Sequence, residues 1–76
     1  MTASDLQDLL VRTLTRTAGG TQRRWRLVVG SVRLHDAATH AHCNWSVDPT
    51  GTAREVAEVE SLLDRVRLEH AIVSAG

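Results

Sequence analysis

Residues 24–35 read R-W-R-L-V-V-G-S-V-R-L-H, and this stretch decides the fold that we expect. Apolar and polar side chains alternate through its first half, which is typical of a half-buried β-strand. Unbroken alternation would place Ser31 and Arg33 in the core. A two-residue hairpin turn at Gly30-Ser31 avoids this and puts the large apolar side chains on one face. A β-bulge at Gly30 within one long strand would have the same effect, so both interpretations stay open.

The stretch that follows predicts a third strand. Residues 36–39 have the composition of a short loop, and residues 39–47 alternate again, with Trp45 and Val47 on the apolar face. Residues 48–51, D-P-T-G, have the residue order that a type I turn prefers. The three strands would therefore be antiparallel neighbours.

Amphipathic helices are predicted on either side of these strands. Ser4 with Gln7 and Thr52 with Glu55 have the spacing of capping boxes, which mark helix starts. Gly19-Gly20 would end the first helix. The first apolar stripe consists of Leu6, Leu9, Leu10, Thr13, Leu14 and Thr17. The second consists of Val56, Val59, Leu62, Leu63 and Val66.

The expected fold is a single small α+β domain spanning residues 1–76, with α-β-β-β-α order. Because each helix must bury its stripe, both helices should pack on one face of a three-stranded antiparallel sheet. That face would carry Trp25, Leu27, Val29, Val32, Leu34, Cys43, Trp45 and Val47. The tail, residues 71–73, would fold back onto the core or pair with a sheet edge.

The opposite face of the sheet would be open to solvent and is the expected working surface. It would carry Arg24, Arg26, Arg33, His35, His40 and His42. The formal net charge of the chain is zero, but residues 1–34 hold six Arg against two Asp, and residues 35–76 hold three Arg against seven acidic residues. A charge asymmetry of +4 against −4 suggests a basic surface that faces a partner, although the two halves can equally neutralise each other.

No catalytic motif is found in the sequence. His42 and Cys43 are neighbours on the predicted strand, so their side chains would leave opposite faces and could not share a proton. Gly19-Gly20 follows a helix and does not open one, so it lacks the context of a phosphate-binding loop. We therefore expect no enzymatic activity.

A zinc site is one alternative function. His40 and His42 form an H-x-H pair on one strand face, about 7 Å apart at their α-carbons by strand rise. His35 would approach them if the second and third strands pair, and three imidazoles can form an open zinc site. Histidines on an exposed strand face are otherwise ordinary solvated polar residues.

Nucleic-acid binding is the second alternative, through phosphate contacts of Arg24, Arg26 and Arg33, with His35 beside them. Both tryptophans are predicted in the core, so no exposed aromatic residue would stack on bases. The predicted element order resembles that of the double-stranded RNA-binding domain. That family has a basic run at the start of its second helix, where this chain has Thr52-Ala53-Arg54-Glu55, and only Arg54 matches in kind.

We favour a non-catalytic module that binds a protein partner or forms a homodimer through the open sheet face. Apolar residues outside the helix stripes could supply contacts: Val11, Leu68, Ile72 and Val73. A single cysteine, no secretion signal in residues 1–8 and no long apolar run predict a cytoplasmic protein without a membrane segment and without a required cofactor.

Overall fold

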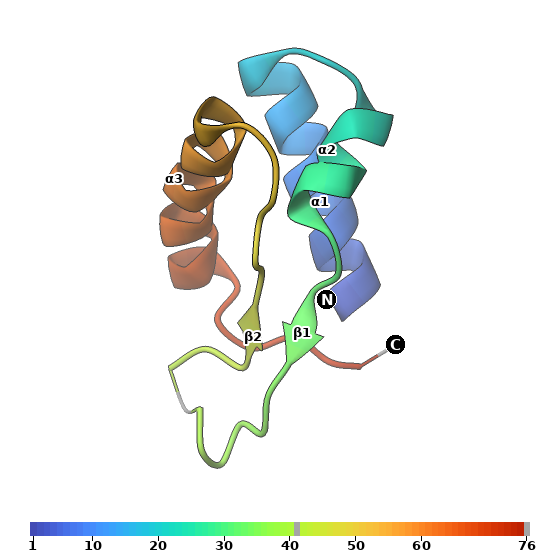
Figure 1. Ribbon diagram of the computed structural model, residues 1–76. Helices are drawn as coiled ribbons and strands as arrows, with labels where there is room; N and C mark the ends of the chain where they lie inside the picture. Colours follow the sequence, from blue (N-terminus) through green and yellow to red (C-terminus); the bar gives the residue numbers. More distant parts are fainter. Residues whose placement is uncertain (41, 76) are drawn as a thin grey trace.

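Three helices and a two-stranded antiparallel sheet make up the computed structural model, which describes residues 1–40 and 42–75 (Figure 1). The elements in chain order are α1 (Ala3–Ala18), α2 (Gln22–Val29), β1 (Arg33–Leu34), β2 (Trp45–Ser46) and α3 (Ala53–Glu69). The chain is thus a compact α+β domain, but the predicted α-β-β-β-α order is wrong. The resemblance to the double-stranded RNA-binding domain depended on that order and is not supported.

The main difference from the prediction lies in residues 22–29, which form the helix α2 instead of a strand. The side chain of Thr21 accepts a hydrogen bond from the backbone N–H of Arg24 and caps the helix start. Trp25, Val28 and Val29 are buried, at the spacing of one helix face. Leu27, which strand parity would bury, is 64% exposed.

Gly30 ends α2 and is neither a hairpin turn nor a bulge. Its φ of 67° lies in the left-handed region, which glycine adopts without the steric cost of a Cβ atom. Its backbone N–H donates to the carbonyl of Arg26, 3.0 Å away, as the last bond of the helix. Trp25, Val28 and Val29 therefore reach one side through helix geometry, and no chain reversal at Gly30 is needed.

The two long helices agree better with their sequence patterns. The capping box of α3 is the predicted one, with reciprocal bonds between Thr52 and Glu55. The capping box of α1 is formed by Thr2 and Asp5, two residues earlier than predicted. Gly19 ends α1, as expected.

Among the described residues of the predicted third strand, 39–40 and 42–47, two pair with β1 as a strand, in the register Arg33 opposite Ser46 and Leu34 opposite Trp45. After β2 an extended segment runs upward between α3 and the other two helices (Figure 1). The N–H of Thr50 donates to the carbonyl of Val28, 2.9 Å away, and no hydrogen-bonded turn forms at residues 48–51.

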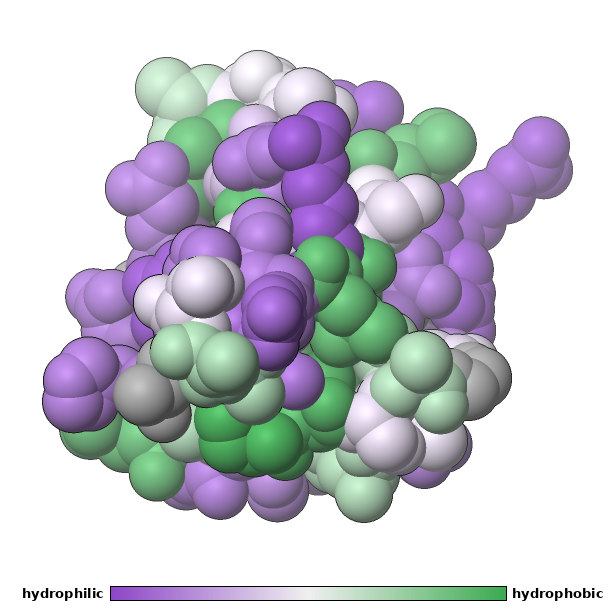
Figure 2. Space-filling model, turned by 90° about the horizontal axis from the view of Figure 1, so that it is seen from below, coloured by the Kyte–Doolittle hydropathy of each residue, from purple (hydrophilic) through white to green (hydrophobic). Residues whose placement is uncertain are grey.

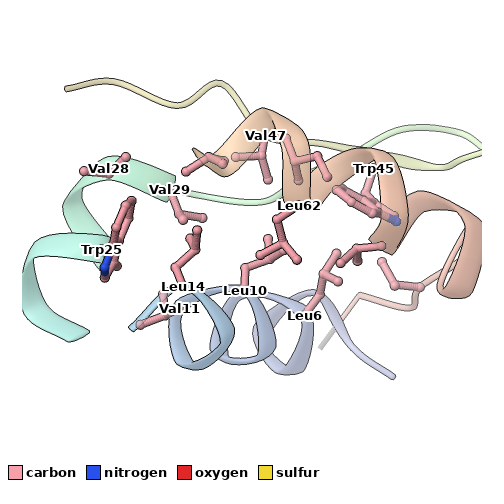
Figure 3. Close-up of a cluster of buried hydrophobic side chains, with 14 residues drawn as sticks. Leu6, Leu10, Val11, Leu14, Trp25, Val28, Val29, Trp45, Val47 and Leu62 are labelled. Atoms are coloured by element: carbon pink, nitrogen blue, oxygen red, sulfur yellow. The ribbon is translucent and has the colours of Figure 1, made fainter. Parts of the chain in front are cut away.

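The core lies between the three helices and the segment around β2. Figure 3 shows Leu10 of α1, Val29 of α2 and Leu62 of α3 pointing toward one another. Both tryptophans are buried, which confirms their predicted place in the core. The complete cluster consists of Leu6, Leu10, Val11, Leu14, Trp25, Val28, Val29, Trp45, Val47, Val59, Leu62, Leu63, Val66 and Val73.

The tail folds back onto the domain, as expected, and meets the start of the chain. Val73 is buried, and Thr2 and Ser74 form a parallel β-bridge. The N–H of Ala3 donates to the carbonyl of Ser74 at 2.9 Å, and the N–H of Ser74 donates to the carbonyl of Met1 at 3.0 Å. No helix in the described part of the chain is long and apolar enough to cross a membrane.

The Glu55 carboxylate is expected to make stability depend on pH. A hydrogen bond from Arg24 and the cap bond from the Thr52 N–H lower the pKa of Glu55 from 4.5 to about 2. A carboxylate with a lowered folded-state pKa stabilises the protein above the unfolded pKa, and this contribution disappears as the pH falls from about 4.5 to about 2. We expect Glu55→Gln to lower the melting temperature at pH 7 and to have little effect near pH 2.

Thermal melts of the wild type and Glu55→Gln between pH 2 and 7 would measure this difference. Glu58→Gln is the matched control, because Glu58 is exposed on the same helix. A difference between wild type and Glu55→Gln that stays constant over this range would contradict the prediction.

Candidate functional site

One end of the molecule, which we call the sheet end, gathers chain segments that are distant in sequence. It consists of β1, β2, the loop of residues 35–44 and the tail of residues 71–75, at the bottom of Figure 1. The His35 N–H donates to the carbonyl of Asn44 at 2.7 Å and closes the loop. Ala41 lies outside the described residues. This end contains the predicted histidine ligands and most of the irregular backbone, where binding residues are often found.

Asn44 joins the loop to the tail. Its backbone N–H donates to the carbonyl of Ala71 at 3.0 Å. Its side-chain amide pairs with the backbone of Val73: Nδ2 donates to the carbonyl at 2.7 Å, and Oδ1 accepts from the N–H at 2.9 Å. The amide therefore takes the place of a neighbouring strand's peptide group and satisfies both polar groups of a buried residue.

Trp45 anchors the same end to α3. Its indole Nε1 donates to the carbonyl of His70 at 2.7 Å, next to the end of α3. The guanidinium of Arg67 lies over the indole ring, 5.9 Å from its centroid, which is cation–π distance. The sheet end is therefore held by two buried side chains from consecutive positions, Asn44 and Trp45.

Apolar side chains are exposed at the sheet end. Leu34 is 38% exposed and Ile72 is 55% exposed. The hydrogen bonds from His35 to Asn44 and from Asn44 to Ala71 bring the segments that carry these two residues close together. Seen from below, hydrophobic residues gather in the lower middle of this face, with hydrophilic residues around much of them (Figure 2). Contiguous exposed apolar patches, in contrast to single exposed side chains, mark interaction surfaces.

The histidines predicted as zinc ligands are only partly brought together. The rings of His35 and His40 stack, with centroids 4.6 Å apart and planes at 24°. Ring nitrogens of both already have partners: His35 Nε2 is 2.8 Å from Ser46 Oγ, and His40 Nδ1 is 2.9 Å from Thr39 Oγ1. A metal ion at either of these nitrogens would have to displace its hydroxyl partner.

His42 is exposed on the same loop, beyond the stacked pair. Within residues 1–40 and 42–75, no three histidine, cysteine or acidic side chains are close enough to hold a metal ion together. A zinc site at His35, His40 and His42 stays a prediction, and it would require the loop to rearrange.

The arginines that were predicted to share one basic face lie on different elements. The prediction of that shared face is therefore wrong. Arg24 and Arg26 belong to α2, and only Arg33 belongs to the sheet. Arg24 makes two hydrogen bonds to Glu55, at 2.8 and 2.7 Å. Arg26 pairs with Asp8 at 2.9 Å and Arg33 with Asp48 at 3.4 Å. Each guanidinium thus already has a carboxylate partner with which a phosphate would compete.

Two residues that matter at the sheet end have positions opposite to those predicted. Strand parity placed Asn44 in solvent and Leu34 in the core, whereas Asn44 is buried and Leu34 is exposed. Of the apolar residues proposed for partner contacts, Val11 and Val73 are buried in the core, while Ile72 and Leu68 are exposed. Asn44 is buried because its side chain bonds to the backbone of Val73, a contact that strand parity does not predict.

A concave region lies at the other end of the molecule. It is a cleft of about 320 Å³ between the end of α1, α2 and the start of α3. Its charged lining is mixed, with Arg24, Arg54, Glu55 and Glu58, and the Arg24–Glu55 ion pair spans part of it. No ligand charge is favoured by such a lining.

Comparisons with family models, curated proteins and solved structures gave no match for this chain.

Proposed function

We propose that this protein is a non-catalytic interaction module that binds another protein chain through the sheet end. The observation that supports this most is the exposure of Leu34 and Ile72 on neighbouring segments of the sheet end of a small domain. Burying the exposed parts of these side chains would contribute roughly 1 kcal/mol each, since full burial of such a residue is worth about 1.5–3 kcal/mol. The polar loop around them fits the rim of a protein interface.

Protein binding is better supported than nucleic-acid binding. Phosphate contacts by Arg24, Arg26 or Arg33 would replace an existing ion pair with a carboxylate in each case. The carboxylate partner would compete with the phosphate in each case, although an exposed ion pair of this kind contributes only about 0–1 kcal/mol. Trp25 and Trp45 are both buried, so neither is available as a stacking platform.

Binding would be tested with matched surface variants. Leu34→Glu and Ile72→Glu place a charge in the proposed interface, and Leu68→Glu changes a leucine on α3 that is 88% exposed. The immobilised wild-type chain would be used to isolate partners from the native host, and the affinity of each purified partner would then be measured. We expect Leu34→Glu and Ile72→Glu to weaken binding at least tenfold and Leu68→Glu to leave it unchanged.

Circular dichroism and melting temperature would first establish that the three variants fold. Equal affinity of wild type, Leu34→Glu and Ile72→Glu for every purified partner would refute the proposal. An equal loss in Leu68→Glu would also refute it, because binding would then not depend on the sheet end.

A further inference from the structure

We infer that the partner is a second copy of this chain, whose β1 strand pairs antiparallel with β1 of the first copy. The result would be a continuous four-stranded sheet in the order β2-β1-β1-β2 across a two-fold axis. This inference rests on the proposed function and assigns it a partner. The observation that supports it is the geometry of the outer edge of β1, the edge that faces away from β2.

The outer edge of β1 has backbone groups available for pairing. The His35 N–H bonds to Asn44, and Arg33 pairs with Ser46, so these residues direct their backbone groups toward β2. Backbone groups alternate in direction along a strand, so the N–H and C=O of Leu34 point to the opposite edge. Within residues 1–40 and 42–75 neither group has a backbone hydrogen-bond partner.

A two-fold axis through this edge would satisfy both groups at once. With Leu34 of one copy opposite Leu34 of the other, each N–H would donate to the other copy's carbonyl, as in the hydrogen-bonded pair of an antiparallel ladder. The same operation makes the interface self-complementary, which a cyclic dimer requires. The exposed part of Leu34 lies on the strand that carries this edge, where the second copy would cover it.

Of the usual devices that protect an edge strand, β1 has one, its length of two residues. The others are charged side chains, proline and a bulge. Residues 31–35 contain no proline, and the one charged side chain among them, Arg33, is paired with Asp48 just beyond β2. The formal net charge of zero also removes long-range repulsion between copies.

The short length of β1 limits how tight such a dimer can be. Two paired residues per strand and two apolar side chains bury little surface, which places the interface in the small, transient class of roughly 1,000 Å² or less. We therefore expect a dimer that dissociates on dilution, with half-association at a concentration on the order of 100 µM.

Sedimentation equilibrium of the wild type from 10 µM to 1 mM, with about 100 µM as the expected midpoint, would measure the association. We expect Leu34→Glu to weaken dimerisation at least tenfold and the control Leu68→Glu to leave it unchanged. Hydrogen exchange of the wild type provides a readout that needs no variant: the Leu34 amide should become protected at least fivefold as the concentration rises.

A wild type that is monomeric at 1 mM would overturn the inference. A dimer that persists in Leu34→Glu, or one that leaves exchange of the Leu34 amide unchanged, would overturn it as well, because the contact would lie elsewhere. If the wild type is monomeric but still binds a purified partner in a Leu34-dependent way, only the self-pairing fails. If that binding is also absent, the proposed function fails with it.

Discussion

Replacing Trp45 with alanine is expected to reduce the free energy of unfolding by about 3–5 kcal/mol, the usual cost of removing a buried aromatic side chain. Trp45 is 2% exposed and packs in the core beside α3. The change also leaves the carbonyl of His70 without its indole donor and removes the ring beneath Arg67. A chain of this length has a total stability of roughly 4–11 kcal/mol, so the variant should be marginally folded.

Urea denaturation followed by far-UV circular dichroism would measure the loss, with Trp25 as the remaining fluorescence probe. Trp45→Phe is the informative control, because it keeps an aromatic ring in the core but removes the Nε1 donor. We expect this control to lose less than half as much stability as the alanine variant. A loss below about 1 kcal/mol in Trp45→Ala would contradict the assigned role.

Replacing Asn44 with alanine is expected to cost about 2–4 kcal/mol. Asn44 makes two side-chain hydrogen bonds to the backbone of Val73, and both are buried. Each bond contributes about 1 kcal/mol net, and a buried backbone group left without a partner adds a desolvation penalty of about 1–3 kcal/mol. The tail should therefore detach from the sheet end before the rest of the domain unfolds. Hydrogen exchange at Val73 and Ser74 would detect this as a selective loss of protection.

The Asn44→Asp variant distinguishes the contributions of the two hydrogen bonds to stability. An ionised carboxylate can still accept from the N–H of Val73, but its second oxygen would face the Val73 carbonyl at hydrogen-bond distance. The protonated acid could donate there as the amide does, so the folded state should favour protonation. Relative to the wild type, we expect this variant to be more stable at pH 4 than at pH 7. The opposite order would mean that the Nδ2 bond to Val73 contributes little.

The largest error of the sequence-based prediction concerns α2, which was predicted as a strand. Residues 22–29 contain Trp25, Leu27 and Val29 at strand spacing, and also Trp25, Val28 and Val29 at helix spacing. Eight residues are too few for periodicity to separate the two, and β-branched residues favour a strand. The deciding signals were Thr21 and Gly30, which match a helix N-cap and a glycine after a helix end.

The long helices were predictable because their stripes extend over about four turns, and the start of α3 was also marked by its capping box, whereas that of α1 lies two residues earlier than predicted. The residues buried in α3, Val59, Leu62, Leu63 and Val66, were all predicted. In α1 the buried stripe differs from the predicted one. Val11 is buried although it was not predicted to be, and Thr17 is exposed although it was predicted to be buried. The sheet end was not predictable, since its burial depends on hydrogen bonds between Asn44 and the tail, which are distant in sequence.

The bridge between Thr2 and Ser74 also has a thermodynamic consequence. The backbone N–H of Ala3, one of the first-turn donors that a helix cannot satisfy by itself, has its partner in the last residues of the chain. Release of the tail therefore leaves the Ala3 N–H at the start of α1 with water in place of its protein partner. The beginning and the end of this polypeptide should order and melt together, as one cooperative unit, instead of fraying independently.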